Sequence, residues 1–151
     1  MNRPDITGIH HVKLPVTDLA ASVVWYERVL GFQIFVEFPD EDGVVRGVAG
    51  TLAGLGDAGL ALRENPDVAK GINGFDPVSF GIADRAAAEA WVAWFDELGV
   101  EHSPVIDATI GWIVSTRDPD GTEIRFYSFS AHGIDQSKRP GFGRIVAPRG
   151  V

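Results

Sequence analysis

The sequence predicts an α+β domain made of two βαβββ modules with pseudo-twofold symmetry. The segment HHVKLPVTDLAASVVWYERVLGF, which starts at His10, is matched at an offset of 66 residues by DPVSFGIADRAAAEAWVAWFDELGV, which starts at Asp76. Each copy begins with a strand pattern, continues with a helix pattern and is followed by three short apolar segments. Because one such module cannot bury the apolar face of its own sheet, two modules are expected to form one fold.

The first strand of each copy shows the alternation of a half-buried strand. Val12, Leu14 and Val16 alternate with His11, Lys13 and Pro15, so the two groups lie on opposite faces. By the same alternation, His10 shares a face with Val12, and we expect it under the helix.

The helix of each copy has a start signal and a stop signal at equivalent positions. An aspartate precedes each helix and can accept hydrogen bonds from the free amides of the first turn. A glycine follows each helix and tolerates the left-handed conformation that ends it. These residues are Asp18 and Gly31 in the first copy, and Asp84 and Gly99 in the second.

The remaining segments complete the predicted organisation. Candidate strands lie at 32–38, 44–52 and 59–63 in the first copy and at 103–106, 112–116 and 122–128 in the second. We expect a single domain at 1–130, with module one at 8–64, a turn-rich linker at 65–75 and module two at 76–130. The rest, 131–151, is a basic tail rich in Gly and Pro, expected to pack against the body or a partner subunit.

The stretch DPDGTEIRFYS closes the second copy with a turn and a strand. After the Pro-Gly turn, Ile124 and Phe126 point to one face, while Glu123, Arg125 and Tyr127 point to the other. The charged face meets either bulk solvent or a pocket.

These three stretches resemble the vicinal oxygen chelate superfamily, which includes glyoxalase I, extradiol ring-cleaving dioxygenases, fosfomycin-resistance proteins and bleomycin-binding proteins. The resemblance covers almost everything from Ile9 to Ser130. It implies that the two modules form a curled mixed sheet around a cavity, which takes a small molecule. It also implies a homodimer, because related proteins often pair modules between subunits.

The resemblance also implies where a divalent metal would bind. Metal-dependent members commonly use two histidines and a glutamate, and these positions fall on His11, Pro77 and Arg125. Proline has no ligating side chain, and a guanidinium has no free lone pair and repels a cation. We therefore expect no metal cofactor. The alternative is a divalent metal at a displaced site made of His11, Asp76 and Glu123.

The predicted cavity faces supply candidate functional residues. Arg125 is suited to binding an anionic or carbonyl oxygen, or to stabilising an enolate, and His11 is suited to acid–base chemistry. Alternatively, Glu123 and Arg125 pair only with each other in partial solvent, which stabilises little. The candidates are His11, Arg125 and Glu123 for catalysis, and Lys13, Ser79 and Tyr127 for ligand binding.

Three functions remain open on these residues. The first is a metal-independent enzyme, such as a lyase, isomerase or dioxygenase-like protein, that acts on a small organic molecule. The second is a binding protein that sequesters a ligand such as an antibiotic or a metabolite. The third is a metal-dependent lyase, isomerase or ring-cleaving dioxygenase with displaced ligands. This sequence contains no motif that distinguishes a protein that only binds a ligand in a pocket from an enzyme that converts it there.

Composition limits the partners and the compartment. The formal net charge is −8, which disfavours a general nucleic-acid surface. There is no cysteine, no membrane-length apolar run and no apolar core of a signal peptide at the N-terminus. We expect a cytoplasmic protein with a small-molecule partner and neither a nucleic acid nor a membrane partner.

Overall fold

A computed structural model describes residues 2–147 of the chain, which form two compact units. The first unit runs to Phe75 and includes the turn Asp118–Thr122, and the second holds Asp76–Arg117 and the chain from Glu123 onward. Residue 1 of the predicted domain and residues 148–151 of the predicted tail lie outside the described part.

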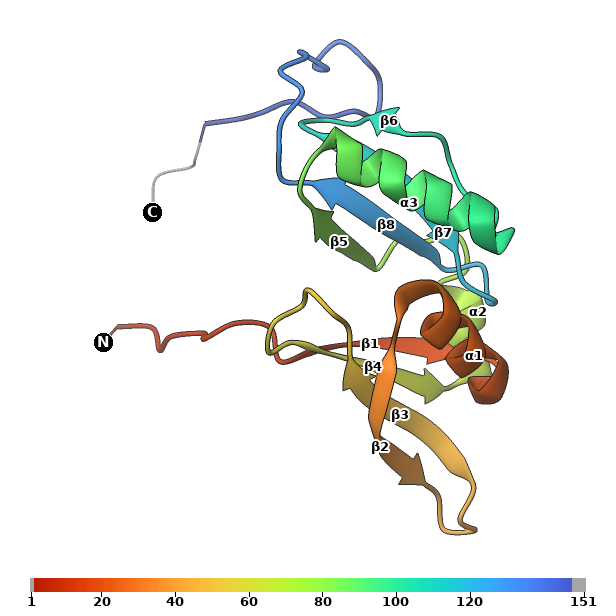
Figure 1. The fold of residues 1–151 in the computed structure, drawn as a ribbon. Coiled ribbons are helices and arrows are strands. Elements are labelled where there is room, and N and C mark those ends of the chain that lie inside the picture. The colour runs from red at the N-terminus through yellow and green to blue at the C-terminus, as the bar shows by residue number, and fades with distance from the viewer. Residues whose placement is uncertain (1, 148–151) are drawn as a thin grey trace. The chain divides into compact units, whose positions relative to one another are not determined.

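The first unit contains a four-stranded mixed sheet in the order β1-β4-β3-β2 (Figure 1). Strand β1 is parallel to β4, and the other neighbours are antiparallel. The elements are β1 (His11–Val16), α1 (Leu19–Leu30), β2 (Gln33–Pro39), β3 (Val45–Thr51), β4 (Gly59–Glu64) and α2 (Pro66–Gly71).

Helix α1 packs on one face of this sheet. Leu14 and Val16 of β1 are buried there with Leu60 and Leu62 of β4, and Tyr26 of α1 is also fully buried. Burying one large apolar side chain contributes about 1.5–3 kcal/mol, so this cluster is the main source of stability in the unit.

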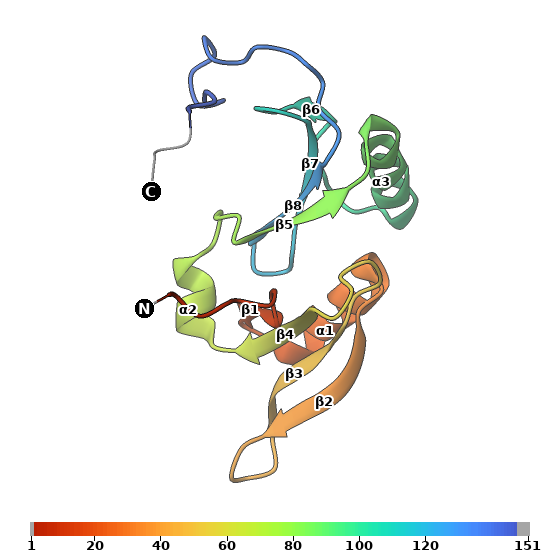
Figure 2. The same ribbon diagram turned by 90° about the vertical axis from the view of Figure 1, so that its left-hand side faces the viewer.

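The second unit repeats the topology with a sheet in the order β5-β8-β7-β6, and β5 is parallel to β8. Figure 2 shows α3 along one face of this sheet. The elements are β5 (Val78–Ile82), α3 (Arg85–Leu98), β6 (Ile106–Asp107), β7 (Trp112–Arg117) and β8 (Glu123–Ser128). The predicted α+β fold with two βαβββ modules is confirmed.

An aromatic cluster fixes α3 to its sheet. The rings of Trp91 and Phe126 stack with centroids 4.3 Å apart, and the fully buried Phe95 lies 5.7 Å from Phe126. Such pairs add about 0.5–1.5 kcal/mol beyond the burial of their area.

The predicted helix signals all act as caps. The Asp18 carboxylate accepts from the amide of Ala21 at 3.1 Å, and Asp84 accepts from that of Ala87 at 2.9 Å. Gly31 and Gly99 end the helices with φ of 71° and 66°, in the left-handed region. The two modules therefore share their helix boundaries as well as their strand order.

The segment 65–75, which we expected to be a turn-rich linker, also contains the short helix α2. The Asn65 side chain accepts from the amide of Val68 at 3.2 Å, and Pro66 occupies the first turn. An N-cap asparagine followed by a proline is a helix start signal, since proline lacks only an amide hydrogen that would have no partner there.

Strand β6 is shorter than predicted and is displaced. Ser103 still bonds to Ser115, through its amide at 2.8 Å and its hydroxyl at 2.9 Å, but Pro104 then removes an amide donor. Regular pairing therefore resumes only at Ile106.

The described part of the tail, 131–147, has no helix or strand and packs on the second unit. The buried Gln136 donates to the carbonyl of Asp107 at 3.1 Å, and His132 lies 2.7 Å from the carbonyl of Ala108. The hydroxyl of Thr109 donates to the carbonyl of Phe142. Within residues 2–147, no helix has the length and apolar character needed to cross a membrane.

The DPDG turn is organised by one buried carboxylate. Asp118, 5% exposed, accepts from the amides of Asp120 and Thr122 at 2.9 and 3.0 Å and from the hydroxyl of Tyr26 at 2.8 Å. Burial raises the pKa of both Asp118 and Tyr26, and the negative charge of Asp118 raises the pKa of Tyr26 further. Gly121 completes the turn with φ of 79°.

Replacing Tyr26→Phe should lower the free energy of unfolding by about 1.5–3 kcal/mol at pH 8, because an ionised buried acceptor loses a donor. The folded pKa of Asp118 lies above its unfolded value, so stability falls as the pH rises between the two values. Tyr26→Phe removes a hydrogen bond that lowers the folded pKa of Asp118, so it raises this pKa further above the unfolded value. The free energy of unfolding that Tyr26→Phe costs should therefore decrease as the pH falls from the folded pKa to the unfolded pKa. Urea denaturation at several pH values measures this. The prediction is contradicted if the destabilisation by Tyr26→Phe is the same at every pH while the destabilisation by Asp118→Asn changes with pH.

Candidate functional site

The face of the first sheet opposite α1 carries the predicted residues of module one. His11 and Lys13 are exposed, whereas Leu14 and Val16 on the other face are buried. In register, His11 lies beside Gly59 of β4, and Lys13 lies beside Ala61. The predicted register of β1 is therefore correct.

A hollow of about 530 Å³ lies on this face. Its floor consists of small residues on β3 and β4, namely Gly47, Ala49, Gly59 and Ala61. Phe35 and Phe38 of β2 also line it, with 69% and 47% of their surface exposed. The volume is within the range of cavities that hold small organic ligands.

Two histidines meet at the edge of the hollow. The Nδ1 atoms of His10 and His11 are 2.9 Å apart, so one imidazole donates a hydrogen bond to the other. His10 is exposed and lines the hollow, so its expected position under the helix was wrong. The reason is that β1 begins only at His11, and strand alternation does not extend to His10.

In the second unit, the alternation read from DPDGTEIRFYS is confirmed. Ile124 and Phe126 are buried, and Glu123, Arg125 and Tyr127 are partly exposed on the other face. Arg125 lies in register between Ser79 of β5 and Ser115 of β7, and Ser79 is exposed.

Arg125 is held by two carboxylates. Its Nη1 lies 2.9 Å from the Asp76 carboxylate, and its Nε lies 3.2 Å from that of Glu123. The pairing of Glu123 with Arg125, which the sequence offered as an alternative to catalysis, is thus present, and Asp76 was the partner that sequence reasoning missed. No strand periodicity pointed to Asp76, because it precedes β5.

The hydroxyl of Tyr127 accepts from the amide of Ile110 at 3.0 Å and lies 3.5 Å from that of Gly111. It therefore anchors the loop before β7. The phenolic proton of Tyr127 is not used in these two contacts and is available to donate.

The residues of the second module do not fit the usual metal site of the resembled superfamily. The resemblance places the two ligand positions that this module would supply on Pro77 and Arg125, and neither side chain ligates a metal. The displaced alternative needs Asp76 and Glu123, yet both carboxylates are already paired with the guanidinium of Arg125. A divalent cation there would have to displace a fixed positive charge.

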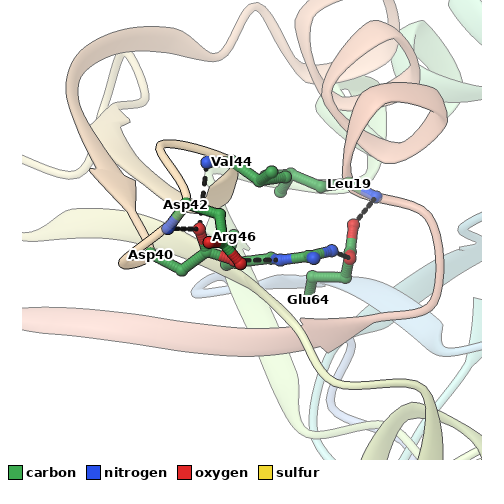
Figure 3. Close-up of polar contacts among 6 residues, drawn as sticks. All are labelled: Leu19, Asp40, Asp42, Val44, Arg46 and Glu64. Atoms are coloured by element: carbon green, nitrogen blue, oxygen red, sulfur yellow. Dashed lines mark hydrogen bonds and ion pairs between the residues drawn. The ribbon is translucent and has the colours of Figure 1, made fainter.

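A second ionic network, which lies outside the predicted set, joins the β2–β3 hairpin to the rest of the first unit (Figure 3). Arg46 of β3 pairs with Asp40 at 3.0 Å and with Glu64 of β4 at 2.6 Å, and Glu64 also accepts from the amide of Leu19 at 3.2 Å. The hydrogen bond from Arg46, together with those from the amides of Val44 and Asp42, lowers the pKa of Asp40. The network fixes the β2–β3 hairpin, which carries Phe35 and Phe38, to β4 and the start of α1.

We expect a double-mutant cycle of Asp76→Asn and Arg125→Gln to give a coupling energy of about 0.2–1 kcal/mol, because both side chains are partly solvated. The coupling should decrease in 1 M salt, where screening is strong. Urea denaturation of the four proteins measures it. The exposed pair Arg85 and Glu89 on α3 provides a matched cycle of the same charge type. Zero coupling at low salt would mean that the Asp76–Arg125 contact does not form.

Comparison with known proteins gives the same fold. The sequence model of the Glyoxalase/Bleomycin resistance protein/Dioxygenase superfamily matches residues 8–126. Among curated proteins, none matches the chain at a significant level.

Several solved structures resemble the chain over most of its length. A glyoxylase/bleomycin resistance protein/dioxygenase domain from Frankia sp. EAN1pec is 25% identical, with a TM-score of 0.65 over 86% of this chain and 96% of that one. A lactoylglutathione lyase from Agrobacterium tumefaciens is 19% identical, with a TM-score of 0.67 over 87% and 100%. An antibiotic binding protein from Streptomyces sp. CB03234 is 22% identical, with a TM-score of 0.66 over 83% and 98%. The lyase and the antibiotic binding protein, at 19% and 22% identity, show only that the fold is shared.

Proposed function

Since the chain belongs to the Glyoxalase/Bleomycin resistance protein/Dioxygenase superfamily, we propose that it binds a small organic molecule without the divalent metal used by many enzymes of this kind. The binding site in this proposal is the hollow on the β1-β4-β3-β2 sheet. Sequestration of the ligand is the function that the side chains support best, and an antibiotic binding protein shares the fold.

The observation that carries the proposal is the hollow itself. It holds about 530 Å³, its floor is apolar, and the few polar side chains at its edge include His11 and Lys13. A ligand site of this type is mostly apolar, with a small number of polar groups that orient the ligand. We assign His11 and Lys13 to that role.

The metal-free part of the proposal is supported by Arg125 and Pro77. By the resemblance, these residues fall on two of the three usual ligand positions, and Arg125 pairs with both Asp76 and Glu123. Removing Arg125 would leave the carboxylates of Asp76 and Glu123 to repel each other. The guanidinium therefore serves as a permanent positive charge between them.

The second unit retains candidate ligand contacts. Within the described residues, Nη2 of Arg125 makes no hydrogen bond or ion pair, and the exposed Ser79 lies beside Arg125 in register. We propose that Arg125 and Ser79 bind an anionic or carbonyl oxygen, that Glu123 orients Arg125, and that Tyr127 donates its phenolic proton.

Acid–base catalysis is a second candidate, which the contact between His10 and His11 favours. If Nδ1 of His11 donates to His10, Nε2 of His11 is a free acceptor and can remove a proton from an enolisable substrate. This would correspond to a lyase or isomerase. The same contact also serves a binding protein, because it fixes the ring orientation of His11.

Replacing Ala49→Leu should reduce the affinity for 8-anilinonaphthalene-1-sulfonate at least about tenfold, because a larger side chain would fill the floor of the hollow. Fluorescence titration measures this, with thermal melting as the check on folding. The exposed Ala20 of α1 gives the matched control Ala20→Leu, which should bind like the parent. Equal affinity in Ala49→Leu would place binding elsewhere.

Ligands found by screening should be recovered chemically unchanged after incubation with the protein. Turnover of such a ligand that disappears in His11→Ala would instead support catalysis.

We further propose a homodimer that resides in the cytoplasm, in line with the absence of cysteine. Both units expose large apolar side chains that an interface would cover, such as Ile9 at 69% and Phe129 at 86%. Light scattering should give twice the 16.3 kDa mass of one chain. The mass of a single chain at micromolar concentration would contradict the dimer.

A further inference from the structure

We propose that the ligand of the hollow is a flat aromatic compound that carries a negative charge. This inference rests on the proposed function and specifies the chemical class of the ligand. It follows from three features of the hollow on the first sheet: the small side chains of its floor, the position of its aromatic side chains and the sign of its charged side chains.

The floor is flat because its side chains are minimal. Across β4 and β3, Gly59 pairs with Thr51, Ala61 with Ala49, and Arg63 with Gly47. Successive positions on the same face lie about 7 Å apart along a strand, and neighbouring strands lie about 5 Å apart. Gly47, Gly59 and the methyl groups of Ala49 and Ala61 therefore form a low patch about 7 Å long and about 5 Å wide, which is comparable to a fused two-ring system.

A β-bulge turns an extra phenylalanine toward this floor. The register of β2 shifts between Ile34 and Val36, so Phe35 has no partner on β3. Without the bulge, Phe35 and Phe38 would point to opposite faces, since they are three residues apart. With the bulge, both line the hollow while remaining largely exposed. Exposed phenylalanines beside a flat apolar floor favour an aromatic ring, which they can contact edge-on or by offset stacking.

The charged groups at the hollow favour an anion. The lining contains two cationic side chains, Lys13 and Arg63, and one acidic side chain, Asp57. Within residues 2–147, neither cation makes an ion pair. A β-carbon at position 47 would lie 3.4 Å from both Cδ and Nη1 of Arg63, so this side chain lies across Gly47 at one end of the floor. The local excess of positive charge contrasts with the net charge of −8 of the whole chain.

The arrangement disfavours other ligand classes. A saturated ring system has no π face for edge-on or offset contact with Phe35 and Phe38. A cationic ligand would be repelled by Lys13 and Arg63. A neutral aromatic compound would gain the apolar contacts but leave both cations unpaired.

Four bicyclic probes separate the shape of the ligand from its charge. They are 2-naphthoate, 2-naphthalenemethanol, 2-naphthylmethylammonium and decahydro-2-naphthoate, each titrated by calorimetry at low salt. 2-Naphthoate should bind roughly three- to tenfold more tightly than the alcohol, since one partly solvated ion pair is gained, and the ammonium should bind most weakly. The saturated acid should bind roughly three- to tenfold more weakly than 2-naphthoate.

Variants assign the preference to residues. Lys13→Met and Arg63→Met should each lower the affinity for 2-naphthoate toward that for the alcohol, and should change the affinity for the alcohol less than that for 2-naphthoate. Phe35→Leu should reduce the preference for the aromatic acid over the saturated acid. Lys70→Met, on α2 and outside the lining of the hollow, is the charge-matched control and should bind all four probes like the parent.

The outcomes distinguish this inference from the proposed function. If all four probes bind equally and Ala49→Leu weakens all of them, the site stands and the ligand class is wrong. The ligand class is also wrong if the ammonium binds best, if the saturated acid binds as tightly as 2-naphthoate, or if 2-naphthoate does not bind. If Ala49→Leu changes no affinity, the proposed site itself fails. If probe affinity falls as the protein concentration rises, a second copy occupies the hollow and the inference is overturned.

Discussion

Each four-stranded sheet of this protein buries one face beneath a helix, and the other features of the molecule depend on that constraint. Strand residues alternate between faces, so every apolar residue placed under α1 or α3 leaves a neighbour on the opposite face. In the first unit, Leu14 under α1 leaves Lys13 opposite, and Leu60 and Leu62 leave Ala61 between them. In the second unit, Ile124 and Phe126 under α3 leave Arg125 on the other side. The same burial that stabilises the fold thus selects the side chains available for a site.

The two modules use these opposite faces differently. The first module keeps its face open, with small residues on the floor of a hollow. Two cations, Lys13 and Arg63, lie at its edge and make no ion pair within residues 2–147. The second module occupies its face with Arg125, which binds Asp76 and Glu123, and with Tyr127, which anchors a loop. The resemblance predicts a metal-binding carboxylate at position 125, and a guanidinium stands there instead. This cation pairs with the two acids that a displaced metal site would need. We therefore place ligand binding mainly on the first module.

Much of the fold was predictable, because local signals and global packing agree along the repeats. The caps Asp18 and Asp84, the stop residues Gly31 and Gly99, and the alternation of DPDGTEIRFYS all depend on residues close in sequence. The errors came from other sources. Helix α2 was missed because Asn65 and Pro66 were interpreted as turn residues rather than as a cap and a first turn. The position of His10, the bulge at Phe35, the Arg46 network and the partner Asp76 depend on strand ends and cross-strand register, which periodicity does not specify.

The central claim is that this member of the superfamily binds its ligand without a metal. The most direct measurement is the metal content of protein purified without chelators, determined by mass spectrometry. It is combined with calorimetric titration of one ligand before and after dialysis against EDTA. The account predicts far less than one divalent ion per chain and the same affinity in both titrations. A stoichiometric divalent ion that is lost in His11→Ala, together with loss of ligand binding after EDTA, would contradict it.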